Sequence, residues 1–141
     1  MRKKSIKTIK VQNPQVILKN LCEDISLISP EKGCSHCLKS NERIDRHLWL
    51  SPNMVKKQVK EICAALCKIF PKNTRFYKKN LNKLLNDLEN IDPYIKTILL
   101  NKKTIFVSHE AFSYFCRDYH LKQIFLDHNG NDPHLKNLNS I

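Results

Sequence analysis

The sequence predicts an α/β fold from three observations. Residues 104–126 have the patterns of a strand, a helix and a second strand, the order of a parallel βαβ unit. The two stretches before this unit, 51–70 and 74–100, carry apolar residues at helical spacing. Hydrophobic residues make up 41% and charged residues 27% of the 141-residue chain, which is typical of a globular domain and argues against full disorder.

The N-terminal part of the chain mixes basic and apolar segments. Residues 1–28 predict a short basic helix followed by a short strand, because the apolar residues of "CEDISLISP" alternate weakly up to Pro30. Residues 30–46, "PEKGCSHCLKSNERIDR", are predicted to form a polar loop, since they contain Pro30 and Gly33 among charged side chains.

A helix is predicted to begin at Ser51 and Pro52. Serine can accept hydrogen bonds from the first free N–H groups of a helix, and proline suits the first helical position. The helix should end near Phe70, before Pro71. One apolar stripe supports it, with steps of four, three, four and three residues: Val55, Val59, Ile62, Leu66 and Ile69.

A second and longer helix is predicted to begin near Thr74, after the turn "PKN". It should extend for about 18 residues, or about 27 Å. Asp92-Pro93 then predicts either a kink or a restart, with an apolar pattern continuing to about Leu100. Its apolar residues again step by four, three, four and three: Tyr77, Leu81, Leu84, Leu88 and Ile91.

The segment from residue 104 onward places a histidine at a strand end. "TIFVS" is predicted as a strand, "EAFSYFCRDY" as a helix and "LKQIFL" as another strand. His109 follows the first strand, where ligands bind in open α/β sheets. His47 stands at a similar junction, just before the Ser51 helix start. Together they form a candidate metal pair, because imidazole is the commonest metal ligand in proteins; the alternative is that each is a hydrogen-bonded structural or surface residue.

Composition narrows the classes of function. The net charge of +12 raises nucleic-acid binding as an alternative, but the lysines are spread over the N-terminus and two helices without interleaved aromatic residues. Two glycines, Gly33 and Gly130, cannot build a phosphate-binding loop. No stretch has the roughly 18 to 20 apolar residues of a membrane span. "MRKKSIKTIKVQ" lacks the apolar region of a secretory signal.

Three segments follow one another in the order and spacing of a known family. "DRHLWLSP", "FPKNTRFYKKNLNKLLNDLENID" and "VSHEAFSYFCRDYHLKQI" resemble the substrate-binding receptors of bacterial zinc and manganese ABC importers, the TroA-like superfamily with a helical backbone. "HNGNDPHLKNL" also looks like a loop of that family. The match extends from about residue 45 to residue 138, and the order of several segments makes it specific.

The resemblance implies a partial two-lobe substrate-binding-protein fold with incomplete parallel sheets. Residues 1–70 would be the C-terminal part of lobe 1, residues 71–100 the backbone helix, and residues 101–141 the N-terminal part of lobe 2. His47 would supply the metal ligand of the first lobe and His109 that of the second. A histidine at the second position suits zinc, with manganese and iron as alternatives.

The resemblance also implies a cellular role. The partners would be a divalent metal ion and an ABC permease in the inner membrane, and the location would be the periplasm or cell envelope. No catalytic constellation is present: Glu110 beside His109 does not form His-Glu-x-x-His, so no enzymatic activity is expected.

The sequence departs from the family pattern in several places. Arg46 replaces the usual proline of the first motif. An export signal, an earlier histidine ligand and a later acidic ligand have no counterpart in the matched segments, so the resemblance implies the middle part of a receptor about twice as long. Because two of four ligands would be missing, weak metal binding or none is expected.

The cysteines fall into two groups. Cys34, His36 and Cys37 lie where family members often carry a metal-collecting loop; the alternatives are a local disulfide or two free thiols. The other four are expected to be small buried apolar residues: Cys22, Cys63, Cys67 and Cys116. The remaining histidines are expected at the surface: His36, His120, His128 and His134.

Overall fold

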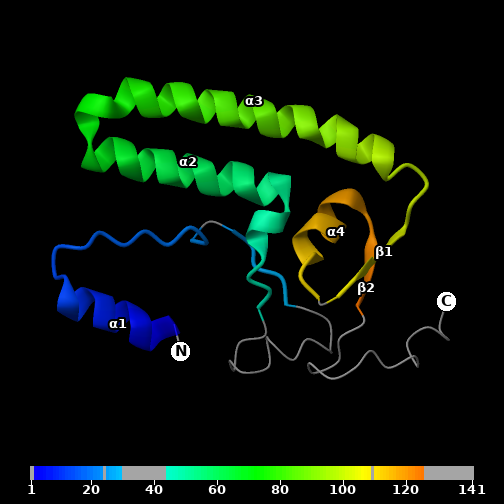
Figure 1. Cartoon of the computed structure of the whole chain (residues 1–141), viewed down its shortest axis with the longest axis horizontal. Helices are drawn as coiled ribbons and strands as arrows, with labels where there is room; N and C mark the ends of the chain where they lie inside the picture. Colours follow the sequence, from blue (N-terminus) through cyan, green and yellow to red (C-terminus); the bar gives the residue numbers. More distant parts are fainter. Residues whose placement is uncertain (1, 24, 30–43, 109, 126–141) are drawn as a thin grey trace.

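The structure is a computed structural model, and it describes residues 2–23, 25–29, 44–108 and 110–125 (Figure 1). Its elements match the prediction in two long helices followed by a βαβ unit, while the strand predicted before Pro30 is not among them. They are the helices α1 (Arg2–Gln12), α2 (Pro52–Ile69), α3 (Thr74–Ile98) and α4 (Ser113–Tyr119), the strands β1 (Thr104–Val107) and β2 (Lys122–Phe125), and the 3₁₀ turns η1 (Leu48–Leu50) and η2 (Pro71–Asn73).

The two strands confirm the predicted parallel unit. β1 and β2 pair in parallel, with Thr104 opposite Lys122 and Val107 opposite Phe125. The backbone N–H of Lys122 also donates to the carbonyl oxygen of Lys103, at 2.7 Å. α4 is the connection that a parallel pair requires, since parallel strands cannot be joined by a tight turn. The predicted α/β class is therefore confirmed, with a sheet of two strands in the part of the chain that the structure describes.

α2 and α3 form a pair of long antiparallel helices joined by η2 (Figure 1). α2 begins as predicted: Pro52 occupies its first turn, and the Ser51 hydroxyl accepts from the Met54 N–H at 3.2 Å. α3 continues through Pro93 to Ile98, so the helix does not restart there. The 25 residues of α3 give it a length of about 37 Å.

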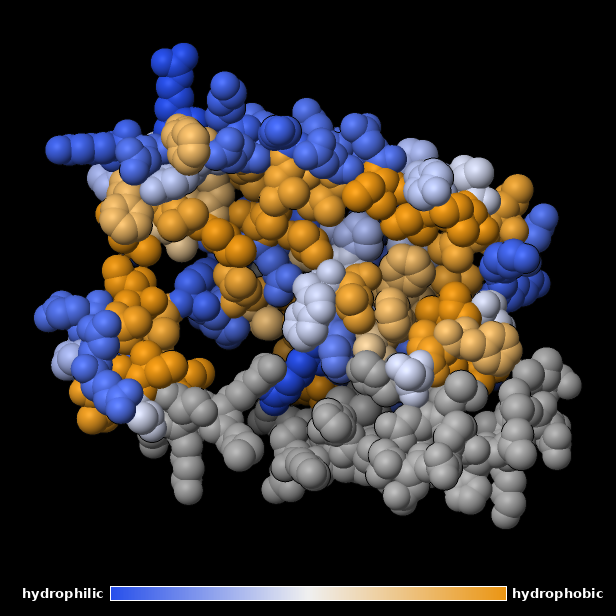
Figure 2. Space-filling view, viewed as in Figure 1, coloured by the Kyte–Doolittle hydropathy of each residue, from blue (hydrophilic) through white to orange (hydrophobic). Residues whose placement is uncertain are grey.

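The two sides of α3 differ in polarity. Figure 2 shows hydrophilic side chains along the outer edge of this helix and hydrophobic ones between it and the elements beneath.

The hydroxyl of Tyr119 in α4 donates to the Asp92 carboxylate of α3 at 2.9 Å. Lys96 also lies 2.6 Å from that carboxylate, and these two partners hold the pKa of Asp92 below its usual value. The C-terminal end of α3 is thus connected to the βαβ unit.

The N-terminal segment contains the predicted basic helix, α1, but not the predicted strand. No strand occurs among the described residues between α1 and η1. The hydrogen bonds of Ile28 explain why: its N–H donates to the Tyr114 hydroxyl and its carbonyl accepts from the Asp45 N–H. The partners of this segment are thus a side chain and a loop instead of a neighbouring strand. Further back, Lys19 bridges Glu23 and Glu61 at 2.9 Å each, which connects this segment to α2.

A small core lies where four parts of the chain meet. It consists of Ile25, Leu48, Met54 and Tyr114, from the N-terminal segment, η1, α2 and α4. Burial of such apolar side chains stabilises the fold by about 1.5–3 kcal/mol each. Because Leu48 follows His47 directly, this core also fixes the backbone that carries His47. Among the helices that the structure describes, none is both long and apolar enough to cross a membrane.

Candidate metal centre

His47 stands at the junction predicted from the sequence. It is the residue that precedes η1, and η1 leads directly into the Ser51 cap of α2. Its side chain is 23% exposed, so the imidazole is accessible while its backbone is held. The Trp49 ring lies edge-on to the imidazole with 5.5 Å between the ring centroids.

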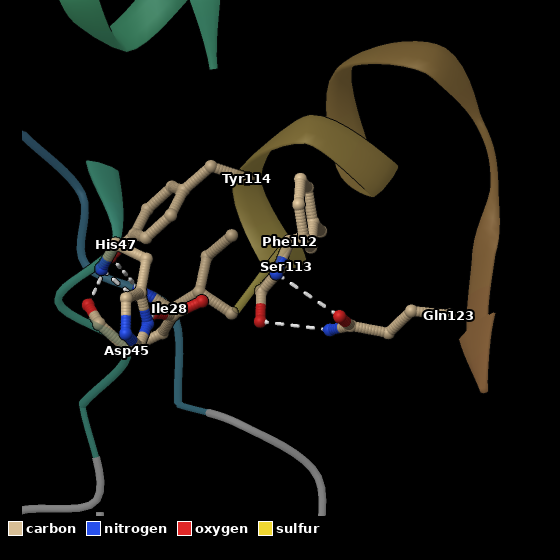
Figure 3. A network of polar contacts seen from close by, with 7 residues as sticks. All are labelled: Ile28, Asp45, His47, Phe112, Ser113, Tyr114 and Gln123. Carbon is tan, nitrogen blue, oxygen red and sulfur yellow. Dashed lines mark hydrogen bonds and ion pairs between the residues drawn. The ribbon is translucent and has the colours of Figure 1, made fainter. Parts of the chain in front are cut away.

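The Asp45 carboxylate sets the orientation of the imidazole (Figure 3). Its Oδ1 atom lies 2.7 Å from Nδ1 of His47 and accepts from the His47 backbone N–H at 2.9 Å. A carboxylate oxygen only accepts, so Nδ1 donates to it, and in the neutral form of the ring Nε2 is the nitrogen with a lone pair. Metal-binding histidines commonly donate their other ring N–H to a carboxylate in this way. The arrangement therefore suits metal binding through Nε2.

Asp45 itself is held by Tyr114. The Tyr114 hydroxyl donates to the carbonyl oxygen of Asp45 at 2.9 Å and accepts from the Ile28 N–H at 3.1 Å. Figure 3 shows Tyr114 reaching from α4 to the loop of Asp45 and His47. Tyr114 is completely buried, and this burial raises the pKa of its hydroxyl. A proton is therefore kept on the hydroxyl, which lets it donate to Asp45.

A second contact fastens α4 to the start of α2. The hydroxyl of Ser51 donates to the Asp118 carboxylate at 2.5 Å. Asp118 also accepts from Arg117, whose Nη2 lies 2.9 Å from Oδ1. Ser51 is fully buried, so water cannot replace this contact. The loop of His47 is thus held to α4 on both sides, through Asp45 and through Ser51.

The segment between β1 and α4 is fixed by Gln123 of β2. Its Oε1 accepts from the Phe112 N–H at 3.0 Å, and its Nε2 donates to the Ser113 hydroxyl at 3.2 Å (Figure 3). Glu110 and Ala111 in the same segment are buried. α4 begins at Ser113, four residues after His109 and later than the sequence indicated.

The other predicted site residues lie outside the described part of the chain. His109 falls in the gap between 108 and 110, and Cys34, His36 and Cys37 fall between 29 and 44. The structure therefore places only His47 of the predicted ligands. In the ranges that it does describe, His, Cys, Asp and Glu side chains form no group of three or more that could hold a metal ion.

Three residues of the site were missed in the sequence. Asp45, Tyr114 and Gln123 act through contacts across 2, 69 and 11 positions of the chain. Only the first had a local signal, a carboxylate two residues before a histidine. The role of Tyr114 was hidden, because an aromatic residue at helical spacing indicates core packing and says nothing of its hydroxyl.

Comparison with known proteins extends the sequence match. The family model "ZnuA: Zinc-uptake complex component A periplasmic" matches residues 3–141. The chain is 36% identical over 83 residues to the high-affinity zinc uptake system protein ZnuA of Bacillus subtilis (strain 168), covering 57% of this chain and 26% of that protein. It is 31% identical over 125 residues to the zinc-binding lipoprotein AdcA of Streptococcus pneumoniae (strain ATCC BAA-255 / R6), covering 86% and 24%.

Solved structures share the fold. A crystal structure of ZnuA superposes with a TM-score of 0.79 at 29% identity, over 98% of this chain and 51% of that one. The periplasmic zinc-binding protein TroA from Treponema pallidum has a TM-score of 0.70 at 19% identity, over 98% and 50%, which shows the fold alone. The chain spans 26–36% of the length of the first curated relatives it matches and about half of the solved chains.

These matches confirm the predicted fold class and the resemblance read from the sequence. The neighbours are two-lobe proteins, and the family is one of solute-binding receptors and not of enzymes. The family model covers nearly the whole chain, including the loop of His47 and the βαβ unit. The chain belongs to the ZnuA family of periplasmic zinc-uptake components.

Proposed function

We propose that this chain acts in zinc uptake as the metal-binding receptor of an ABC importer, with His47 and His109 as zinc ligands. The observation that supports this most strongly is the carboxylate of Asp45 at 2.7 Å from Nδ1 of His47. It orients the ring and favours the tautomer that leaves Nε2 for a metal ion. Zinc binds the neutral form of an imidazole, and Nε2 is then the nitrogen that bonds the ion.

The contacts of α4 support His109 as the second ligand. Tyr114 and Asp118 hold α4 against the loop of His47, and Gln123 fixes Phe112 just before the helix. The described residues before and after position 109 belong to β1 and to the segment that leads into α4. We propose that both imidazoles reach the same ion.

We propose that His47 and His109 hold zinc only weakly when no further ligand joins them. Structural four-ligand zinc sites supply about 10–16 kcal/mol of apparent binding free energy. Losing a group that only hydrogen-bonds to a ligand already lowers affinity by about 10- to 100-fold. A site with two ligands should therefore bind at least about 100-fold more weakly than a complete one.

An auxiliary loop that collects metal or closes a disulfide would be formed by Cys34, His36 and Cys37.

From the family we also propose the cellular role of the chain in metal transport. The chain would deliver zinc, or alternatively manganese or iron, to a membrane permease from the periplasm or cell envelope. Residues 1–70 would belong to the first lobe and residues 101–141 to the second. Residues 71–100, which include α3, would be the helix between them.

A competition titration tests the ligand assignment. Zinc is titrated into the Cys34→Ser/Cys37→Ser background in the presence of a chromophoric chelator, so that the auxiliary loop cannot contribute. His47→Ala and His109→Ala should each lower zinc affinity by at least about 10-fold, because each removes a ligand. His120→Ala is the matched control, since His120 is an exposed residue at the C-terminal end of α4. Tight one-to-one binding that survives His47→Ala would overturn the proposal.

A further inference from the structure

Two cysteines on α2 face each other away from the His47 loop. Cys63 and Cys67 are four residues apart, and their Sγ atoms lie 3.9 Å from one another. Cys63 is buried, Cys67 is half-buried, and both are free thiols. The pair lies more than ten residues beyond the Ser51 cap, on the helix that packs against α3.

Helix geometry makes a disulfide between them unfavourable. Side chains four residues apart on a helix have Cβ atoms about 5–6 Å from one another. A disulfide needs Cβ atoms about 3.8 Å apart and sulfur atoms about 2.05 Å apart. Oxidation of this pair would therefore distort α2, and the two sulfurs are better suited to share a partner than to bond directly.

The sulfur–sulfur distance fits one ion held between them. With metal–sulfur bonds of about 2.3 Å, the value for zinc, two sulfurs lie about 3.8 Å apart at a tetrahedral angle and about 4.6 Å apart in a linear arrangement. The observed 3.9 Å lies within this range. Small side-chain rotations would reach either geometry without moving the helix.

The surroundings select the type of ion. In the described ranges no third His, Cys, Asp or Glu joins the pair, so these residues do not supply the four ligands of a structural zinc site. Thiolates are soft ligands and prefer soft ions such as copper(I). An ion that binds with only two ligands, such as copper(I), therefore matches the two thiolates on α2.

We propose that Cys63 and Cys67 form a two-thiolate site for copper(I). Each thiol releases its proton to solvent as its sulfur bonds the ion, so two S–H bonds are exchanged for two S–Cu bonds and nothing is oxidised or reduced. The bound site carries one net negative charge. Lys78 of α3 lies close enough for its positive charge to act on Cys63, and it would offset that charge.

Burial is the main cause that raises the pKa of the Cys63 thiol, and the neighbouring Cys67 raises it further. Binding of the ion therefore has to displace the proton of Cys63. The proposal is independent of the zinc proposal, because it uses neither His47 nor His109.

Anaerobic copper(I) titration against a chromophoric chelator tests the site. The full chain is used in the Cys34→Ser/Cys37→Ser background, which removes the other cysteine pair. We expect one copper(I) per chain, and X-ray absorption of the loaded protein should show two sulfur neighbours. Cys67→Ala should weaken binding at least about 100-fold, since removing even a group that supports a ligand costs about 10- to 100-fold.

Two matched variants separate a specific site from general thiol binding. Cys22→Ala and Cys116→Ala each remove one thiol elsewhere and should leave copper(I) affinity unchanged. Cys63→Ala should repeat the effect of Cys67→Ala, and its urea unfolding curve reports whether the buried substitution has damaged the fold. Absence of copper(I) binding in the background protein, or retention of it in Cys67→Ala, would overturn the proposal.

Discussion

Replacing Tyr114 with phenylalanine isolates the contact that joins α4 to the His47 loop. The substitution keeps the ring in the core with Ile25, Leu48 and Met54, and removes only the hydroxyl. That hydroxyl donates to the carbonyl oxygen of Asp45 at 2.9 Å and accepts from the Ile28 N–H at 3.1 Å. The variant therefore loses two hydrogen bonds and no packing.

The burial of the Tyr114 hydroxyl determines how much the free energy of unfolding should fall. Each hydrogen bond contributes about 1 kcal/mol net, and a buried group left without a partner costs about 1–3 kcal/mol. Tyr114 is 0% exposed, so water cannot take the place of the hydroxyl. We expect Tyr114→Phe to lower the free energy of unfolding by about 2–3 kcal/mol, a large share of the stability of a small domain.

Urea unfolding followed by far-UV circular dichroism measures this loss. Tyr94→Phe is the control, because Tyr94 is 67% exposed on α3 and should change stability by less than about 0.5 kcal/mol. If Tyr114→Phe is as stable as Tyr94→Phe, the hydroxyl does not hold the loop, and the proposed coupling between α4 and His47 is wrong.

Three further changes follow from the same contacts. Asp45→Asn removes the charge beside Nδ1 of His47 and should lower zinc affinity by about 10- to 100-fold in a competition titration. Ser51→Ala removes the cap of α2 and the bond to Asp118, so urea unfolding should show a loss of about 1–2 kcal/mol. Burial raises the pKa of the Cys116 thiol to about 11 from a usual value of 9.0. The Cys116 thiol of the unfolded chain loses its proton at a lower pH than that of the folded chain. The free energy of unfolding should therefore fall as pH rises from about 9 to 11, by at most about 3 kcal/mol.

Each of these changes has its own control. Asp87→Asn, on the exposed side of α3, should leave zinc affinity unchanged, and an equal loss there would point to a general charge effect. Ser108→Ala, at an exposed position after β1, should be as stable as the unmodified chain. Cys116→Ala should show a smaller fall in stability between pH 9 and 11. An identical pH dependence in that variant would contradict the assigned pKa.

The helices and the βαβ unit were predictable because their signals are local. The stripes at steps of three and four residues placed α2 and α3, and Ser51-Pro52 marked the start of α2. The sequence did not show whether the helix continues through Pro93. This proline lies inside α3, where the hydroxyl of Thr97 donates to its carbonyl oxygen at 2.9 Å, and the helix continues.

The predicted strand near Ile28 was wrong for a non-local reason. Alternating apolar residues indicate an extended backbone, but a strand also needs a neighbouring strand to pair with. Here the neighbours are the Tyr114 hydroxyl and the Asp45 backbone, which lie 86 and 17 positions away. The same distance in sequence hid the support of His47, since no spacing rule relates Asp45 to Tyr114.

The ligand assignment can be tested atom by atom with long-range ¹H–¹⁵N spectra of the histidine rings during zinc titration. The proposed site predicts that Nε2 of His47 and one ring nitrogen of His109 shift together as zinc is added, while Nδ1 of His47 keeps the proton that it shares with Asp45. The His120 ring should stay unchanged. Zinc binding that leaves the His47 resonances where they were would contradict the account.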